Sequence, residues 1–384
     1  MYASNESKGG KNKSRRNRKR NGASCEMDLN RNRIRVAIYG CGNFANTRRI
    51  PNLVKTGRVE IIALCDSNPE ALNATSKRFD VSNTYSDAHE MLEAEEMDVL
   101  YSLVPAFART DVEAAAAATG VHIFSEKPQT TRMHVALKID RAISESGVLS
   151  TVGVRERYNP LFQKVRNFLL DKELIHIDYT QWSEHSHRSA QDGKSWPWEL
   201  EKSGGPALEW GVHATDYIRF VTGENVERIQ AYYHHPASCL LPLSSSFSGQ
   251  MTSGATVTLT FLTGTRPPGE NPPRFVFQYA GGCLAIRRRD SKSWSASVNA
   301  LPHFEVVDFD PWLEQDRRFI QAVAENRPEL ILNDYHDGLY SLAPILAGWH
   351  SSRNAGQVIE IEEFLRTEAL EDDVPHRRPG STSS

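Results

Sequence analysis

The stretch from Ile34 to Ala45, with the sequence IRVAIYGCGNFA, constrains the fold of this chain more than any other. An apolar, β-branched run ends at Gly40 and Gly42, and a helix-like pattern follows. Gly40 permits a tight turn, Gly42 lets backbone N–H groups approach a pyrophosphate, and the small Ala45 lets the helix pack closely on the strand. The stretch therefore predicts the strand, turn and helix of a dinucleotide-binding unit. An ordinary glycine turn after a buried strand is the alternative.

Length and composition fit a globular protein of two domains. The chain has 384 residues, of which 39% are hydrophobic and 24% are charged. No stretch approaches the length of an apolar membrane span, and no secretory signal is visible. The five cysteines are scattered and form no Cys-x-x-Cys pair. We therefore expect a reducing, cytoplasmic location, without a disulfide framework or a cysteine metal site.

The net charge of −3 conceals an uneven distribution. Residues 1–33 carry ten Lys or Arg and three acidic residues, a net of +7, so the remainder carries −10. The basic segment has almost nothing to bury, which predicts a disordered tail. An acidic body with a short basic tail indicates no specific nucleic-acid partner, although the tail alone can contact anions.

From Ile34 to residue 155, strand and helix patterns alternate. Strands are predicted near 34–38, 59–65, 98–104, 121–125 and 149–154, and helices near 68–79, 87–94, 109–119 and 131–146. This alternation predicts a doubly wound parallel sheet with helices on both faces, which is a Rossmann domain over residues 34–155.

The pattern changes over residues 156–366. Helices are predicted near 160–171, 207–222, 312–325 and 336–353, and strands near 174–183, 225–235, 254–263, 273–279 and 282–288. Consecutive strands predict an α+β domain with an open, largely antiparallel sheet. Helices are expected on one face of this sheet, and a partner subunit is a candidate to cover the other face. We therefore expect this domain to bind the substrate and to form a homodimer or homotetramer. Residues 367–384 are predicted to be a disordered tail.

Asp66 follows the second strand, 24 residues after Gly42. A carboxylate at this place accepts hydrogen bonds from the ribose hydroxyls of an adenosine and repels a 2′-phosphate. Ser67 and Asn68 come next, where a 2′-phosphate site more often has Arg. The sequence therefore favours NAD over NADP, while a helix-capping role for Asp66 is the alternative.

Ser125-Glu126-Lys127-Pro128 ends a strand at the carboxyl edge of the predicted sheet, where open α/β folds bind ligands. Pro128 restricts the backbone of Lys127 to an extended conformation. An ammonium group held there can stabilise an oxyanion that develops on a substrate. An exposed loop lysine is the alternative.

Glu209, His213 and Asp216 are spaced by four and three residues, which places them on one helical face. A carboxylate beside an imidazole can form an acid–base pair, with Glu209 orienting His213 and raising its basicity. The alternative is an amphipathic helix with a buried, hydrogen-bonded histidine.

The order of these motifs over residues 34–361 resembles the glucose–fructose oxidoreductase / inositol dehydrogenase / MocA-like (Gfo/Idh/MocA) family. The segment from Ser203 to Asp216, SGGPALEWGVHATD, is similar to the family's Gly-Gly-rich segment that leads into Asp-x-Gly-x-His-x-x-Asp. By this resemblance, Lys127 and His213 match the catalytic lysine and histidine. Glu209 stands where the family usually has Asp. Arg109 stands where many relatives have His, which would alter cofactor contacts or admit an anionic substrate group.

The resemblance implies an NAD(P)-dependent oxidoreductase acting on a sugar, nucleotide-sugar or cyclitol. Alternatives are a member that retains its NAD, such as an aldose–aldose oxidoreductase or NAD-dependent glycosidase, and a non-catalytic NAD(P)-sensing regulator. The predicted cofactor site consists of Gly40, Gly42, Asn43, Phe44, Ala45, Asp66, Pro105, Glu126 and Lys127. The predicted substrate contacts are Arg157, Tyr158, Trp182 and Asp216, with His185, His187, Trp196 and Trp198 in the neighbouring loop. No complete metal-ligand set is visible.

Overall fold

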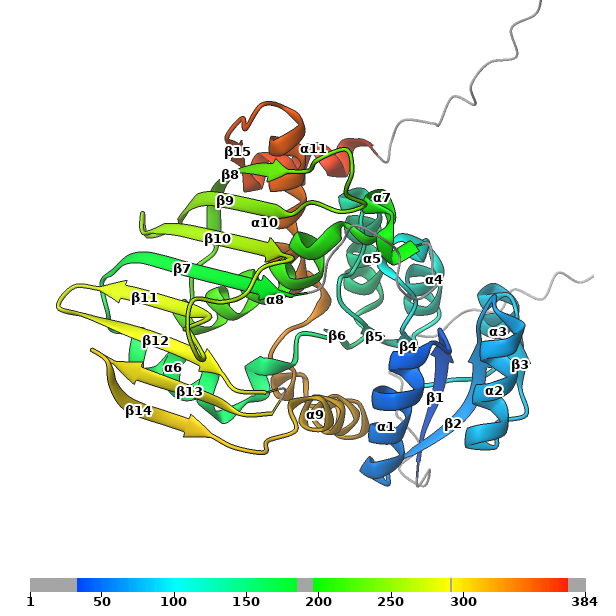
Figure 1. Ribbon diagram of the computed structural model, residues 1–384. Coiled ribbons are helices and arrows are strands. Elements are labelled where there is room, and N and C mark those ends of the chain that lie inside the picture. Colours follow the sequence, from blue (N-terminus) through cyan, green and yellow to red (C-terminus); the bar gives the residue numbers. More distant parts are fainter. Residues whose placement is uncertain (1–32, 185–195, 291, 372–384) are drawn as a thin grey trace, which may run out of the picture. The chain divides into compact units, whose positions relative to one another are not determined.

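The computed structural model describes residues 33–184, 196–290 and 292–371. The predicted N-terminal tail lies outside these residues except for Arg33, and so do residues 372–384. Two sheets organise the described part of the chain (Figure 1).

Sheet A is the parallel sheet that the alternating pattern predicts. Its strands are β1 (Ile34–Tyr39), β2 (Val59–Cys65), β3 (Thr84–Tyr85), β4 (Val99–Ser102), β5 (His122–Ser125) and β6 (Ser150–Val152). Their order is β3-β2-β1-β4-β5-β6, and every neighbouring pair is parallel. This is the strand order of a dinucleotide-binding fold, so the predicted Rossmann sheet is confirmed.

Helices cover both faces of sheet A. They are η1 (Ala45–Arg49, π-helical), α1 (Ile50–Thr56), α2 (Pro69–Phe79), α3 (Ala88–Ala94), η2 (Ala106–Ala108), α4 (Val112–Ala118) and α5 (Met133–Ser146). Apolar side chains of α3, α4 and α5 form one core with the sheet, and those of α1 form another. The second core also contains Phe319, Ile320 and Val323 of α9 (Pro311–Glu325). The prediction placed this helix in the second domain, whereas it packs on sheet A.

Sheet B has the order β14-β13-β12-β11-β7-β10-β9-β8-β15. Its strands are β7 (Leu174–Ser183), β8 (Val226–His234), β9 (Ser244–Met251), β10 (Thr256–Thr263), β11 (Phe275–Tyr279), β12 (Gly282–Arg288), β13 (Trp294–Val298), β14 (Leu301–Val306) and β15 (Ile359–Glu360). Only β7 and β10 pair in parallel among these strands. The predicted largely antiparallel sheet is therefore confirmed, although β9, β13, β14 and β15 were not predicted.

Helices pack on one face of sheet B (Figure 1). The remaining helices are η3 (Arg155–Tyr158), α6 (Pro160–Leu169), η4 (Trp196–Trp198), α7 (Leu200–Ser203), α8 (Gly205–Thr222), η5 (Pro328–Leu330), α10 (Tyr335–Arg353) and α11 (Ile361–Glu371). Inward residues such as Ile177, Phe261 and Phe277 join the core with α6, α8 and α10. Helix α11 continues beyond residue 366, where we expected the folded body to end.

Candidate active site

The glycine turn after β1 has the geometry that its sequence predicts. Gly40 has a φ of +104°, and a β-carbon added there would lie 2.8 Å from backbone atoms of Leu103 and Val104 after β4. Glycine is required at this position because a larger residue has neither the conformation nor the space. A β-carbon added at Gly42 would meet nothing within 4 Å. The open side of Gly42 is therefore where a pyrophosphate would fit against the turn.

Asp66 is fixed beside this turn. Its Oδ2 accepts the backbone N–H of Cys41 at 2.7 Å, and its Oδ1 accepts that of Asn68 at 2.8 Å. Asn68, not Asp66, is the N-cap of α2. Each carboxylate oxygen still has a lone pair that can accept a ribose hydroxyl, so Asp66 fits the adenosine role.

The other residues predicted at the turn divide into exposed and buried ones. Asn43 and Phe44 are exposed at the start of the helical segment, where backbone N–H groups attract an anion. Ala45 is buried and belongs to the core beneath sheet A. Pro105 precedes η2 at the end of β4. The cofactor-binding role of these residues stays a prediction.

Glu126, which is predicted to contact the cofactor, has a buried basic partner. It is 8% exposed, its Oε2 accepts a hydrogen bond at 2.8 Å from Arg49, and its Oε1 accepts the N–H of Lys127 at 3.1 Å. Arg49 also pairs with Asp316 of α9 at 2.9 Å, and both side chains are fully buried. Glu126 therefore ties Lys127 to the interior between η1 and α9, and its place in the cofactor site stays a prediction.

Lys127 reaches from the end of β5 to α8. Its Nζ lies 2.5 Å from Oε1 of Glu209 and 3.3 Å from the carbonyl oxygen of the same residue. The Lys127 side chain is 13% exposed and that of Glu209 is 53% exposed. The longer arm of glutamate thus meets the lysine, and Glu209 orients Lys127 rather than His213.

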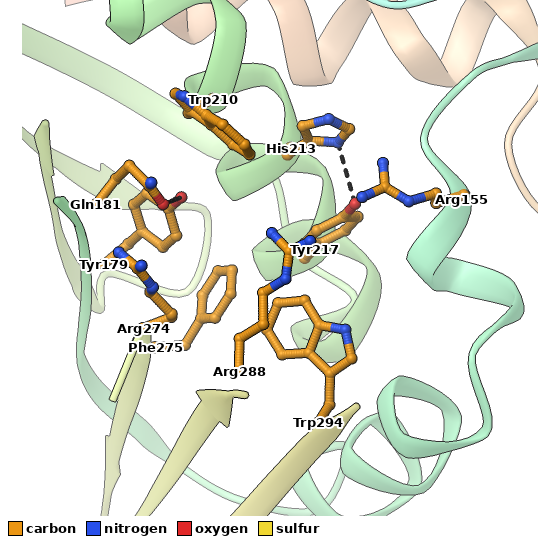
Figure 2. A pocket seen from close by; sticks show the side chains of 10 residues that line it. All are labelled: Arg155, Tyr179, Gln181, Trp210, His213, Tyr217, Arg274, Phe275, Arg288 and Trp294. Atoms are coloured by element: carbon orange, nitrogen blue, oxygen red, sulfur yellow. Dashed lines mark hydrogen bonds between the residues drawn. The ribbon is translucent and has the colours of Figure 1, made fainter. Parts of the chain in front are cut away.

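His213 is buried one helical turn after Glu209 and has a different partner. Its Nδ1 lies 3.0 Å from the hydroxyl oxygen of Tyr217 (Figure 2). Burial, followed by the positive charges of Lys127, Arg155 and Arg288, holds the pKa of His213 well below its ordinary value of 6.5. The imidazole is therefore neutral at physiological pH and can accept a proton.

A pocket opens beside His213 and encloses about 360 Å³, its open mouth included. Ten side chains from α8, η3 and sheet B line it: Arg155, Tyr179, Gln181, Trp210, His213, Tyr217, Arg274, Phe275, Arg288 and Trp294 (Figure 2). Aromatic rings form much of the wall, and guanidinium groups supply most of its polar atoms. Aromatic walls with a few convergent polar groups are typical of small-molecule sites.

Three of the predicted substrate contacts lie elsewhere. Asp216 is fully buried and pairs with Arg157 at 2.6 Å, and Arg157 also lies 2.5 Å from Asp337 of α10. The hydroxyl of Tyr158 accepts the N–H of Leu332 at 3.1 Å. These bonds join η3 and α8 to the chain around α10, so they stabilise the fold and do not form the pocket wall.

Trp182, the fourth predicted contact, does not line the pocket but contacts a residue that does. The guanidinium of Arg274, a lining residue, stacks over the ring of Trp182 at 5.2 Å. Of the predicted loop residues, Trp196 contacts the ring of Phe107 at 5.6 Å, whereas His185 and His187 lie outside the described residues.

Arg109 does not offer its charge to a substrate. It is 1% exposed, pairs with Glu113 at 3.3 Å and donates to Ser125 and to backbone carbonyl groups after β4. The expectation that it admits an anionic substrate group is therefore wrong, because an internal carboxylate already compensates its charge.

Within the described ranges, no three His, Cys, Asp or Glu residues are grouped closely enough to hold a metal ion. No helix in that part of the chain has the length and apolarity needed to cross a bilayer.

Comparison with known proteins places the chain in a family. Residues 34–154 match the model described as "Oxidoreductase family, NAD-binding Rossmann fold", and residues 162–284 match the "GFO/IDH/MocA C-terminal domain". The chain belongs to the Gfo/Idh/MocA oxidoreductase family. Its NAD-binding domain is thus the one built on sheet A.

Individual relatives agree with this assignment. D-apiose dehydrogenase of Paraburkholderia graminis is 30% identical over 200 residues, which is 52% of each chain. Myo-inositol 2-dehydrogenase of Thermotoga maritima is 26% identical over 86% of this chain and 100% of the relative. An oxidoreductase structure from Thermotoga maritima has a TM-score of 0.74 at 20% identity, covering 86% of this chain and 99% of that chain. The WlbA dehydrogenase of Bordetella pertussis, solved with NADH and UDP-GlcNAcA, has a TM-score of 0.68 at 21% identity, covering 85% and 98%.

The sequence motifs of this Gfo/Idh/MocA protein did not identify most of its pocket. Tyr217 could have been found from its i+4 spacing to His213, and Trp210 from its i−3 spacing. Arg274 and Arg288 carry no such signal, because they lie on separate segments of sheet B that only the fold brings together.

Proposed function

We propose that the protein is an NAD-dependent dehydrogenase that oxidises a hydroxyl group of a sugar or cyclitol. One observation carries the proposal: Lys127, at the carboxyl edge of the NAD-binding sheet, meets the helix that presents His213 to a small-molecule pocket. The ammonium group is close enough to lower the pKa of His213. Names of relatives such as apiose and inositol dehydrogenases support the substrate class.

The side chains would act as follows. With Nδ1–H donating to the Tyr217 hydroxyl, Nε2 of His213 is free to accept the proton of the substrate hydroxyl. Lys127 stabilises the negative charge that develops on that oxygen, and Glu209 holds the ammonium in position. NAD, when bound at the glycine turn, would accept the hydride from the carbon that carries this hydroxyl group. In the reverse reduction, His213 returns the proton.

The preference for NAD over NADP belongs to the same proposal. The carboxylate of Asp66 is held at the turn by two backbone N–H groups, so it cannot easily turn away from a 2′-phosphate. Its negative charge would repel that phosphate and accept the ribose hydroxyls of NAD.

We also propose a cytoplasmic enzyme that assembles as a homodimer or homotetramer. The cysteines described are all free, which fits a reducing compartment. The helices that contact sheet B lie on one face, and its other face carries small polar residues such as Ser246, Ser248 and Thr258. Light scattering coupled to gel filtration tests the assembly, and a monomeric mass would reject it.

The test of the function is a panel of sugars, inositols and nucleotide-sugars, with NAD and NADP supplied separately and free NADH monitored by absorbance. Release of NADH with a panel member is the expected result. Turnover without NADH release would instead indicate an enzyme that retains its cofactor. NADH binding without turnover of any panel member would favour a sensing regulator and reject the dehydrogenase.

A further inference from the structure

Three guanidinium groups point into the pocket beside His213. Arg155 comes from η3, Arg274 immediately precedes β11, and Arg288 ends β12. Figure 2 shows Arg155 and Arg288 directed toward Tyr217 from different sides, with Arg274 beside Tyr179. Segments far apart in the sequence thus concentrate positive charge at one small cavity.

Within the described part of the chain, Arg155 forms an ion pair with a carboxylate, and Arg274 and Arg288 form none. Nε of Arg155 lies 3.5 Å from Oε1 of the buried Glu156. Arg274 donates to the carbonyl of Thr180 at 3.4 Å, and Arg288 donates to the carbonyl of Asp290 at 2.8 Å. Backbone carbonyls orient these groups without carrying a formal charge, and the buried Glu156 acts on Arg288 without an ion-pair contact.

Aromatic rings hold the same two groups in place. The Arg274 guanidinium stacks over Trp182 at 5.2 Å, and that of Arg288 stacks over Trp294 at 5.4 Å. Stacking preorganises a guanidinium without using all of its N–H donors. The donors that remain are suited to a planar, anionic acceptor.

The clustering is costly while no anion is present. Burial and the nearby Arg155 lower the pKa of Arg288, and burial lowers that of Arg274, with Arg288 adding to the effect. The nearby acidic residue Asp290 is exposed, and its Oδ1 accepts the N–H of Lys292. A negative group bound between the arginines would offset this repulsion.

We propose that the substrate is a small sugar acid whose carboxylate is bound by Arg274 and Arg288 while one of its hydroxyl groups meets His213. The inference rests on the proposed function and specifies its substrate class. The guanidinium groups that line the pocket call for an anionic group on the substrate. Paired arginine donors also match a planar carboxylate in bidentate geometry.

The carboxylate would also help the base. Burial lowers the pKa of His213 most, and Lys127, Arg155 and Arg288 lower it further, which makes the imidazole a weak proton acceptor. A bound anion counters the two arginines and moves that pKa back toward neutrality. A neutral sugar in the same position would leave the base weakened, so the charge would favour both binding and the chemical step.

The test compares matched acid and neutral ligands. Glucuronate with glucose, galacturonate with galactose and gluconate with sorbitol are titrated calorimetrically into the NADH-loaded protein, with glucose 6-phosphate as a further arm. Turnover with NAD is measured for the same panel. We expect at least one acid to bind roughly 10- to 150-fold more tightly than its neutral partner, as for hydrogen bonds to charged groups.

Variants assign the effect to the arginines. R274Q and R288Q should each remove most of the preference for the acid, and R288K should retain part of it. R287Q is the matched control: Arg287 is the neighbouring residue on β12, it bonds to Ser297 at 2.9 Å and it does not line the pocket. This control should keep the preference, and thermal unfolding of each variant verifies that it folds.

The outcomes separate this inference from the proposed function. Equal or tighter binding of neutral ligands, with NADH formed from them, would overturn the sugar acid and leave the dehydrogenase intact. Arginine-dependent binding of an acid without any turnover in the panel would support the carboxylate site and count against the dehydrogenase. A preference for the phosphate ester over every acid, or a preference unchanged in R274Q and R288Q, would also overturn the inference.

Discussion

Alanine substitutions at the two glycines of the turn should affect different properties, stability at Gly40 and cofactor binding at Gly42. At Gly40 the β-carbon would lie 2.8 Å from backbone atoms of Leu103 and Val104, with φ at +104°. The left-handed conformation costs about 1–2 kcal/mol, and overpacking against a fixed backbone costs about 1–3 kcal/mol. G40A should therefore lower the free energy of unfolding by about 2–5 kcal/mol, since both penalties apply at one residue.

At Gly42 the added β-carbon meets nothing within 4 Å. G42A should therefore change the free energy of unfolding by no more than about 0.5 kcal/mol, as surface substitutions usually do. The methyl group would instead stand between the turn and the cofactor pyrophosphate. Losing one hydrogen bond to that charged group, worth about 1.5–3 kcal/mol, would weaken NADH binding roughly 10- to 150-fold.

Urea unfolding followed by circular dichroism measures the stability of both variants, and fluorescence titration with NADH measures affinity. If G42A bound NADH as tightly as the unaltered protein does, the pyrophosphate would not lie against Gly42. If G40A were as stable as the unaltered protein, the backbone of Leu103 and Val104 would not restrict residue 40 to glycine.

Three further predictions follow from the site and its surroundings. Because the pKa of His213 is lowered, the acid limb of the pH profile of kcat/KM should lie below pH 6.5. R288Q removes a positive charge and should move this limb to higher pH. A limb unmoved by R288Q would show that the charge of Arg288 does not lower the pKa of His213. D216A should lower the free energy of unfolding by about 3–5 kcal/mol, because Arg157 loses a buried partner. The same variant should keep the KM for the substrate. A raised KM in a stably folded D216A protein would restore Asp216 as a substrate contact. D66A should reduce the ratio of KM for NADP to KM for NAD, measured by steady-state kinetics, and an unchanged ratio would remove Asp66 from the cofactor choice.

The sequence was most informative where pattern and structure are local. The glycine turn, the alternating elements of sheet A and the helix that carries His213 all follow from short segments. Strand β9, SSSFSGQM, was missed because Phe247 and Met251 are its only large apolar residues, and its outward positions are polar. The packing of α9 on sheet A was also unpredictable, because an apolar helix face does not specify which sheet it covers.

The site shows the same division. Lys127 lies in a contiguous motif, and His213 lies on a helix with recognisable spacing, so both could be proposed from the sequence. Their partners could not, because contact between Lys127 and Glu209 depends on how α8 lies against the edge of sheet A. Arg274 and Arg288 become neighbours of His213 only through the folding of sheet B.

His213 is the proposed base of an NAD-dependent dehydrogenase, and single-turnover formation of NADH measures its contribution to the chemical step. The best substrate of the panel is mixed with H213N and saturating NAD, with H234N, altered at an exposed histidine of β8, as the matched control. We expect H213N to form NADH about 10²–10⁴ times more slowly, as for loss of a general base, with unchanged NADH affinity and a normal rate in H234N. If H213N formed NADH at the rate of the unaltered enzyme, His213 would not be the base.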